Sequence, residues 1–254
     1  MNSTNSVIRF VVIMTAGVAL TLALLSTSWG GQIKANEAIF NKRAILGAVS
    51  DYLTEDPKLM PDGKIEELFG SKVEQIALDM SGAVLTKEDI IASGYKGGKP
   101  ENIDLAKEKK KPEAERIFPL YIFNSEKGKS YILSIRGSGL WDEIWGNIAL
   151  KDDLTTIAGA TFDHKGETPG LGAEIKDNPT FPSRFKGKKI FNEAGVYTSV
   201  DVKKTGGTDG NPYAVDGISG ATVTADGVAE MLQRGIKYYL PYLNKQAAAK
   251  KING

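Results

Sequence analysis

The sequence of 254 residues contains no cysteine. This absence excludes disulfides, cysteine-ligated iron–sulfur clusters and zinc sites, and thiol catalysis, because all of them need the sulfur atom. Histidine occurs once, at His164, so a multi-histidine metal site is excluded and a Ser-His-Asp triad could only be built around this residue. No acid partner at a fixed spacing identifies a catalytic pair, so a structural role for His164 is favoured. A redox role would depend on an organic cofactor.

An excess of charge of one sign is also missing. The 32 basic and 31 acidic residues nearly cancel, and this balance gives no basic face of the kind that nucleic-acid binding requires. We therefore expect no nucleic-acid partner. With 41% apolar residues, the chain is able to bury a core in one large domain or two small ones.

A long apolar run lies near the N-terminus. Residues 10–29 carry no charge and would form a helix about 30 Å long, which matches the hydrocarbon thickness of a bilayer. A cleaved signal peptide is the rival interpretation, with a small-x-small site at 26–28, but its apolar region is usually shorter and Trp29 follows this site at once. We interpret residues 1–30 as a tail and a retained membrane anchor.

The side of the membrane on which the body lies is a separate question. Arg9 precedes the apolar run, whereas Lys34 and two later basic residues follow it, so the count of positive charges does not by itself favour an outside body. A short N-terminal tail before a long domain usually behaves as an uncleaved signal, and long domains translocate largely regardless of charge. We predict a single-pass protein whose body lies outside the cytoplasm.

Residues 31–115 are predicted to form a helical first part of the soluble region. Apolar residues recur at helical spacing over 36–53 and again over 63–80, so each stretch is predicted as a helix. Between Tyr95 and Arg116 the chain turns polar and lysine-rich, which is typical of a solvated linker or loop.

The hydrophobic period changes after residue 116. Two runs rich in Tyr, Ile and Phe, separated by a polar turn with Gly128, predict a hairpin over 118–139. Residues 154–164 and 195–204 add strand-like runs. Strands therefore fill the middle of the chain with helices at both ends, which predicts an α+β fold: an N-terminal transmembrane helix, then a soluble domain with an antiparallel β-sheet flanked by helices.

A closing helix is predicted from Asp226. Apolar residues recur at every third or fourth position from there until Pro241 stops the pattern. We take residues 116–245 as the ligand-binding domain and residues 246–254 as a C-terminal tail.

Glycines and large aromatics alternate in GSGLWDEIWGNIAL, residues 137–150. One interpretation is core tryptophans beside turn glycines, since aromatic residues usually pack in the interior. The functional alternative is a backbone that a flat ring can approach closely, with Trp141 and Trp145 as aromatic walls.

A tight turn is predicted in FDHKGETPGLGAEI, residues 162–175. Gly170 belongs to the turn, and Gly172 would permit a second unusual backbone angle. Glu167 and Thr168 stand beside the turn, where they could supply ligand contacts.

Small residues and hydroxyls gather in DGISGATVTAD, residues 216–226, just before the closing helix. A Ser or Thr here could cap the helix by accepting a backbone N–H. The alternative is a phosphate site, because a helix N-terminus offers free N–H groups and partial positive charge, and Gly220 and Ala221 would let an anion approach. Taken alone, this motif is weak.

Together and in this order, the three segments resemble the FMN-binding domain found in the C subunits of the sodium-translocating NADH:quinone oxidoreductase of bacterial membranes. The resemblance extends to the N-terminal span, to NKRAIL and to ELFGSKVEQIALDMSG, and so covers most of the chain. The G subunit of the Rnf electron-transport complex shares ETPGLG and SGAT. The tryptophan-rich segment and the longer N-terminal half favour the quinone oxidoreductase.

This resemblance implies a covalent cofactor. In the family, the last Thr of D-x-x-[S/T]-G-A-T carries FMN through a phosphoester bond, formed by a flavin transferase with FAD as donor. The pattern matches this sequence at every position and implies attachment at Thr222, while Thr224 could still cap the helix. The further cofactor contacts that we take from the three segments are Asp216, Ser219, Gly220, Ala221, Thr224, Leu140, Trp141, Trp145, Glu167, Thr168, Gly170, Leu171 and Gly172.

The resemblance also implies an electron carrier in the inner membrane with its body on the periplasmic side. Electrons would come from an iron–sulfur centre in the membrane subunits and pass to another covalently bound FMN, with sodium export coupled elsewhere. No G-x-G-x-x-G turn opens a helix after a strand, so NADH is expected to bind another subunit. The expected partners are the other subunits, the transferase and membrane lipid.

Three alternatives stay open at this point. The chain could be a G subunit of an Rnf-type complex. It could be a membrane-tethered module that binds a small anion noncovalently, or a flavin enzyme that acts alone on a soluble substrate.

Overall fold

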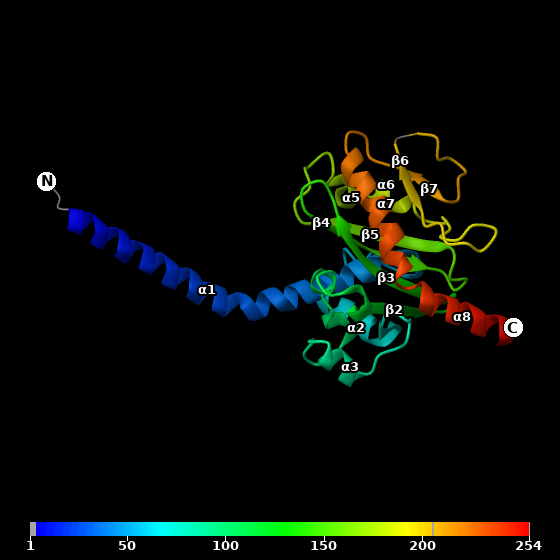
Figure 1. Cartoon of the computed structure of the whole chain (residues 1–254), viewed down its shortest axis with the longest axis horizontal. Helices are drawn as coiled ribbons and strands as arrows, with labels where there is room; N and C mark the ends of the chain where they lie inside the picture. The colour runs from blue at the N-terminus through cyan, green and yellow to red at the C-terminus, as the bar shows by residue number, and fades with distance from the viewer. Residues whose placement is uncertain (1–3, 205, 254) are drawn as a thin grey trace. The chain divides into compact units, whose positions relative to one another are not determined.

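The computed structural model describes residues 4–204 and 206–253 (Figure 1). By its internal contacts the chain divides into two compact units between Lys42 and Arg43, twelve positions beyond the end of the predicted anchor at residue 30. Residues 43–254 form the second unit, which contains the ligand-binding part of the body and residues 43–115 of the predicted helical first part.

The first unit is helical. Helix α1 runs Thr4–Gly47 without interruption, so the predicted anchor and most of the predicted helix over 36–53 belong to one element. Among the described residues, α1 alone is long and apolar enough to cross a membrane. Thr15, Thr21 and Thr27 each donate to the carbonyl four residues earlier, at 2.7–2.9 Å, which lowers the cost of placing a hydroxyl in hydrocarbon.

The body is built on a five-stranded antiparallel sheet in which each strand pairs with the next along the chain. Its strands are β1 (Val73–Leu78), β2 (Phe118–Ser125), β3 (Gly128–Ser138), β4 (Glu143–Leu150) and β5 (Ile157–His164). The hairpin predicted over 118–139 is confirmed as β2 and β3. The predicted α+β class with an antiparallel sheet is confirmed as well.

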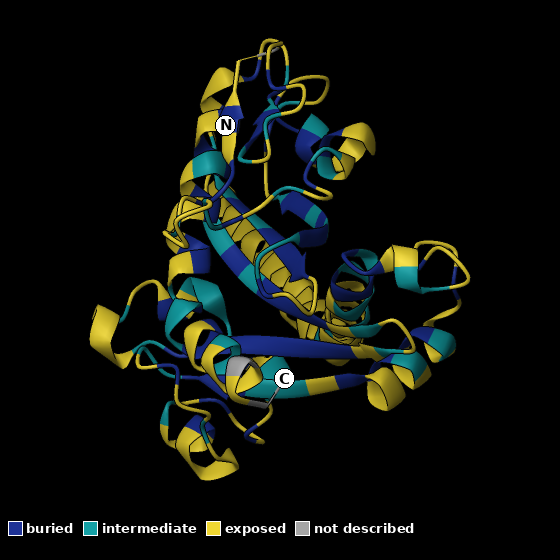
Figure 2. Ribbon diagram, turned by 90° about the vertical axis from the view of Figure 1, so that its right-hand side faces the viewer, coloured by how far each residue is buried: buried dark blue, intermediate teal, exposed yellow. Residues whose placement is uncertain are grey.

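Two hydrophobic cores form on the two faces of this sheet, because side chains alternate along each strand. Ile135 and Ile144 pack with Val228 of α7 (Thr222–Lys237) on one face. On the other face, Ile132 packs with the last turns of α1 and with α2 (Asp62–Lys72). Figure 2 shows the buried strands between these layers.

The prediction of one helix over 63–80 is wrong. Helix α2 ends at Lys72 and β1 begins at Val73, so the apolar residues Val73 and Ile76 belong to a strand. Both are β-branched, which favours a strand, and pairing with β2 outweighs the local helical spacing.

The closing helix also differs from its prediction. Helix α7 begins at Thr222, four residues before Asp226, and ends at Lys237. Pro241 does not stop the pattern, because a further helix, α8 (Leu240–Asn253), begins one residue before it. Proline is tolerated in the first turn of a helix, where its missing N–H has no intrahelical partner. The predicted tail after residue 245 is therefore helical through residue 253.

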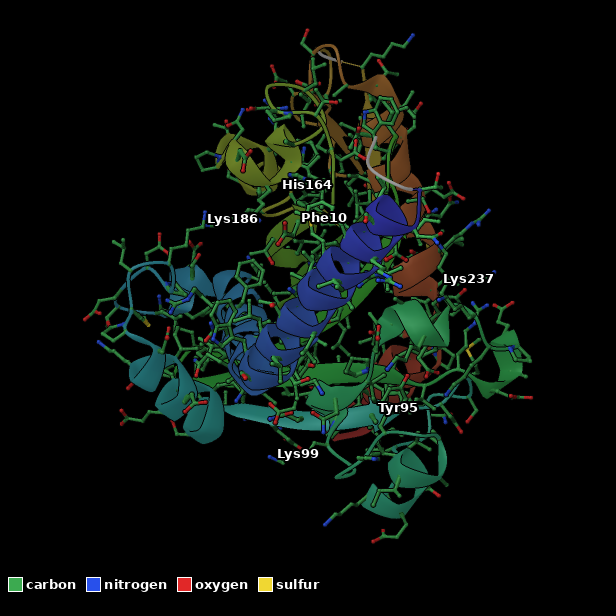
Figure 3. The ribbon with its side chains drawn as sticks, turned by 90° about the vertical axis from the view of Figure 1, so that its left-hand side faces the viewer. Phe10, Tyr95, Lys99, His164, Lys186 and Lys237 are labelled. Atoms are coloured by element: carbon green, nitrogen blue, oxygen red, sulfur yellow. The ribbon has the colours of Figure 1, made fainter. Side chains whose placement is uncertain are left out.

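The lysine-rich segment between Tyr95 and Arg116 is more ordered than the predicted solvated linker. Glu108 is buried within it, accepts hydrogen bonds from the Tyr95 phenol (Figure 3) and the Ile117 N–H, and pairs with Lys111 at 2.7 Å. This carboxylate ties both ends of the segment to the body. The segment contains η2 (Pro100–Asn102), α4 (Leu105–Glu108) and η3 (Glu113–Glu115).

The remaining elements are short. They are η1 (Ser50–Tyr52), α3 (Lys87–Ala92), α5 (Glu174–Asp177), α6 (Thr180–Ser183), β6 (Asp201–Lys203) and β7 (Ala214–Asp216). Of the strand predicted over 195–204, only β6 forms, and it pairs in parallel with β7. This pairing places Lys203 beside Asp216, three residues before the SGAT segment begins at Ser219.

Candidate functional site

The three sequence segments meet at one end of the sheet. The turn after β3 carries Leu140 and Trp141, the loop after β5 carries Glu167 to Gly172, and α7 begins at Thr222. These segments converge because β3, β4 and β5 are neighbours and α7 lies across β3.

The Glu167 carboxylate joins the three segments. Its side chain is 4% exposed, its Oε1 accepts the Trp141 backbone N–H at 2.9 Å, and its Oε2 accepts the Thr224 hydroxyl at 2.6 Å. Burial alone would raise the pKa of this carboxyl. Hydrogen bonds from the Thr224 hydroxyl and from the backbone of Trp141, Asp142 and Leu140 outweigh burial, so the pKa lies below its ordinary value. Glu167 is therefore an ionised, buried acceptor.

Two glycines make room for this carboxylate. A Cβ added at Gly139 would lie 2.5 Å from Glu167 Oε1, and one at Gly172 would lie 2.5 Å from both Glu167 Oε2 and the Thr224 hydroxyl. The prediction that Gly172 adopts an unusual backbone angle is wrong, because its φ is not positive and only space requires glycine here. Gly170 does have a positive φ, of 75°.

The glycines around Trp141 do not provide the predicted open approach for a flat ring. A Cβ at Gly137 would meet Met231 and one at Gly146 would meet Phe162, so both glycines admit neighbouring protein atoms. Trp145 does not join the site either. It lies on the sheet face away from α7, where its ring stacks with the Arg136 guanidinium.

Hydrogen bonds also shape the loop after β5. The Trp141 indole N–H donates to the Thr168 hydroxyl at 3.0 Å, and the Leu171 N–H closes the turn on the Thr168 carbonyl. The His164 Nδ1 accepts the Glu167 backbone N–H at 3.1 Å. His164 thus has a structural contact with the loop after β5.

The first turn of α7 offers one exposed and one buried hydroxyl. Ala221 is the N-cap and has no side-chain capping bond, so the prediction that Thr224 caps the helix is wrong. Thr222, the first helical residue, is exposed, whereas Thr224 is 1% exposed and is bonded to Glu167. The first backbone bond of α7 joins the Ala225 N–H to the Ala221 carbonyl, which leaves the preceding N–H groups without intrahelical partners.

A small cavity of about 130 Å³ opens beside Thr222. Ser219, Gly220, Lys203 and Lys204 line it together with Thr222. Neither lysine was predicted as a site residue from the sequence, although they are the last two residues of the strand-like run over 195–204. Their place depends on the β6–β7 pairing, which no local pattern indicates.

Asp216 and Ala221 have supporting positions. The Asp216 carboxylate accepts the Thr208 hydroxyl at 2.7 Å, and its backbone carbonyl accepts an Arg184 N–H. Ala221 is buried. Both residues hold the loop that leads into α7.

An apolar surface lies next to the start of α7. Leu140, Trp141 and Leu171 are 52%, 69% and 42% exposed. A Cβ at Gly220 would lie 3.0 Å from Leu171 Cδ2, so the second and third segments are in close contact here. Exposed apolar groups gathered in this way mark a binding surface. A helix N-terminus with two lysines suits a phosphate, and the apolar groups suit a flat ring, so these residues fit FMN.

The fold and the site thus define a flavin-binding domain that follows an apolar helix. The family model described as "FMN-binding domain" matches residues 139–237, which include the second and third segments and residues 139–150 of the first.

Named relatives identify the family. The C subunit of the Na(+)-translocating NADH-quinone reductase of Neisseria meningitidis serogroup A is 35% identical to this chain, over 74% of this chain and 76% of the relative. The corresponding subunit of Vibrio campbellii is 29% identical, over 90% of each chain. The crystal structure of the corresponding protein from Parabacteroides distasonis has a TM-score of 0.69 at 33% identity and covers 83% of this chain and 94% of its own. The chain belongs to the family of C subunits of the Na(+)-translocating NADH-quinone reductase.

This membership confirms the predicted family and decides against the Rnf-type alternative. The crystal structure of Shewanella oneidensis NqrC, with a TM-score of 0.65 at 25% identity over 84% of this chain and 99% of its own, has the same fold. The chain is therefore a flavoprotein subunit of an NADH-quinone reductase complex, with other subunits as its partners.

Proposed function

We propose that Thr222 carries FMN through a phosphoester bond and that the chain relays electrons within the complex. The electrons come from an iron–sulfur centre in the membrane subunits and leave to another covalently bound FMN, in a process coupled to sodium export elsewhere in the complex. NADH binds a different subunit. The attachment site is inferred from the contrast between Thr222, which is exposed, and Thr224, which is buried with its hydroxyl bonded to Glu167.

The attachment step is a phosphoryl-type transfer catalysed by a flavin transferase. The Thr222 oxygen attacks the phosphorus on the FMN side of the FAD pyrophosphate, the bond from this phosphorus to the bridging oxygen breaks, and AMP leaves. The hydroxyl proton passes to water, and no electron is transferred. The neighbours Gly220 and Ala221 are small, which gives the transferase access to the Thr222 oxygen.

The chain's own residues hold the two ends of the cofactor in this proposal. Lys203, Lys204 and the first N–H groups of α7 neutralise the phosphodiester, at roughly 0.3–1 kcal/mol for each dipole contact. Leu140, Trp141 and Leu171 cover the ring, and Glu167 holds their loops in place. When bound, FMN supplies redox chemistry in single-electron steps, which suits a relay between one-electron partners.

Intact-protein mass spectrometry tests the proposal on the full chain made together with the transferase. We expect an increment of one FMN less one water on wild-type protein and on Thr224→Ala, and none on Thr222→Ala. An increment that persists in Thr222→Ala and disappears in Thr224→Ala would move the site. Wild-type protein without any increment would contradict covalent attachment and favour a module that binds its anion noncovalently.

A further inference from the structure

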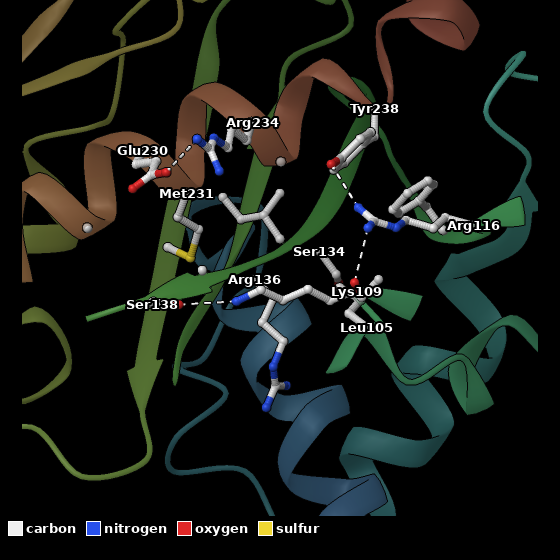
Figure 4. Close-up of a pocket in the computed structure, with 15 residues that line it drawn as sticks. Leu105, Lys109, Arg116, Ser134, Arg136, Ser138, Glu230, Met231, Arg234 and Tyr238 are labelled. Atoms are coloured by element: carbon white, nitrogen blue, oxygen red, sulfur yellow. Dashed lines mark hydrogen bonds and ion pairs between the residues drawn. The ribbon is translucent and has the colours of Figure 1, made fainter. Parts of the chain in front are cut away.

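A second cavity, which we call the basic cleft, lies along the later turns of α7. It has a volume of about 310 Å³ and opens between α7, β3 and residues 105–118 (Figure 4). Its charged rim contains Lys109, Arg116 and Arg234, and its apolar part contains Phe118 and Met231. None of these residues belongs to the proposed flavin site.

The basic cleft is not a packing defect between α7 and β3. A Cβ at Gly137 would lie 2.6 Å from the Met231 Cβ, and one at Gly235 would lie 2.7 Å from the Ile135 Cβ, so helix and strand already touch at these glycines. The cleft lies beside this contact, where residues 105–118 form its other wall. Its shape therefore follows from the course of the lysine-rich segment.

Arg116 is held in the cleft without a counter-charge. Its Nε donates to the Lys111 carbonyl at 3.0 Å. Its two Nη atoms donate to the Tyr238 phenol and to the Lys109 carbonyl, at 3.1 and 3.0 Å (Figure 4). All three acceptors are neutral. Lys109 reaches across to the Ser138 hydroxyl at 3.1 Å. In the part of the chain that the structure describes, neither Lys109 nor Arg116 forms an ion pair.

The opposite wall of the cleft carries an exposed ion pair. Arg234 contacts Glu230 at 2.9 Å, and their side chains are 76% and 57% exposed. Such an exposed pair contributes little to the stability of the fold, so Arg234 is able to pair with another carboxylate at little cost. Arg136 also lines the cleft, but its guanidinium points away to Glu143. The cleft thus presents three cations and one carboxylate on a chain whose net charge is only +1.

Cations above an apolar floor suit an acidic group with apolar neighbours. We propose that the basic cleft is the docking site for an acidic segment of another subunit of the reductase complex. Lys109 directly follows α4, Arg116 lies shortly before β2 and Arg234 lies on α7, so the three cations suit carboxylates spaced along a peptide. The volume of the cleft is near the lower limit of small-molecule pockets, about 300 Å³, yet it has room for a few side chains. This proposal rests on membership of the complex and is independent of the linkage at Thr222.

Site-specific cross-linking identifies the occupant. One variant carries a photoreactive amino acid at position 230, in the cleft. A second variant of the same chain carries it at position 237, on the part of α7 outside the cleft, where Lys237 lies in the wild type (Figure 3). Each full chain is assembled into the complex in its membrane and irradiated. We expect position 230 alone to cross-link to one subunit, at a segment with several carboxylates. Cross-links only to lipid, to a segment without carboxylates, or equally from position 237 would overturn the proposal.

Charge reversal measures the contribution of the cations. The probe is the detergent-solubilised complex purified from a strain that lacks this subunit, titrated with labelled full-length chain. We expect Lys109→Glu and Arg234→Glu each to raise the Kd about tenfold at low salt, with a smaller difference at high salt. Lys110→Glu, at an exposed neighbour outside the cleft, is expected to change it less than about twofold. Equal effects of the three variants, with equal flavin content, would contradict the proposal.

Discussion

The Thr224 hydroxyl donates a 2.6 Å hydrogen bond to the carboxylate of Glu167, a residue 57 positions earlier in the chain. This bond distinguishes two hydroxyls that stand two residues apart in the sequence. Thr224 is buried and its hydroxyl is bonded in the interior, while Thr222, at the start of α7, is exposed.

The two threonines should therefore separate stability from flavin attachment. We expect Thr222→Val to lose the covalent flavin and to change the free energy of unfolding of the apoprotein by less than about 0.5 kcal/mol, because Thr222 is exposed. Thr224→Val should keep the flavin. Its free energy of unfolding should fall by about 1–2 kcal/mol, because the substitution leaves a buried carboxylate oxygen without its donor. Urea titration and in-gel flavin fluorescence measure the two quantities. Loss of stability in the Thr222 variant alone would contradict this assignment.

Glu167 should make the body less stable in acid. Its pKa is lowered in the folded state, so its contribution is present above its ordinary value of 4.5 and is lost as the pH falls through the folded value. We expect Glu167→Gln to unfold more easily than wild type at pH 7, by about 1–3 kcal/mol, with a gap that narrows as the pH falls from 4.5 through the lowered folded pKa. Unfolding free energies measured across this range test the prediction. Glu193→Gln, at an exposed position, should follow the wild-type curve.

Gly172 should tolerate no side chain, whereas nearby Gly166 should. An alanine Cβ at Gly172 would lie 2.5 Å from Glu167 Oε2 and the Thr224 hydroxyl, which forces the carboxylate out of place. We expect Gly172→Ala to lower the free energy of unfolding by about 1–3 kcal/mol and to reduce flavin loading. Gly166→Ala meets no atom within 4 Å and should stay within about 0.5 kcal/mol of wild type. Equal thermal midpoints for the two variants would argue against the space requirement.

The lysines beside Thr222 should speed flavin attachment. Lys203→Ala combined with Lys204→Ala removes two positive charges from the cavity that also contains Thr222. We expect the transferase to load this double variant about three- to tenfold more slowly, and the difference to shrink at high salt. Lys127→Ala, in the turn between β2 and β3, is the matched control and should load at the wild-type rate. Loading time courses followed by mass spectrometry measure the rates.

The absence of cysteine allows a direct test of membrane topology. A single cysteine is introduced at Lys127 in the body or at Asn5 in the tail, and intact cells with a permeable outer membrane are treated with a membrane-impermeant maleimide. If the body is periplasmic, Lys127→Cys should be labelled and Asn5→Cys should be labelled only after lysis. The opposite pattern would place the body in the cytoplasm.

The sequence by itself determined the features that depend on nearby residues. The uncharged run over 10–29 required a helix of membrane length, and the alternating residues on both sides of Gly128 required a hairpin. The order of the three segments, with D-x-x-S-G-A-T unchanged, was sufficient for the family. These inferences hold because the hydrophobic period, the length of an apolar run and the order of motifs are all properties of the linear sequence.

Only the tertiary structure decided what depends on contacts between distant residues. Val73 became part of a strand because β2 was available to pair with it, although its local spacing favoured a helix. Trp145 lay outside the site because strand alternation put it on the far face of the sheet. Thr224 became an interior donor because Glu167 reached it from the loop after β5. A buried carboxylate needs hydrogen-bond donors, and the tertiary fold decides which residues supply them. A local sequence pattern does not identify those partners.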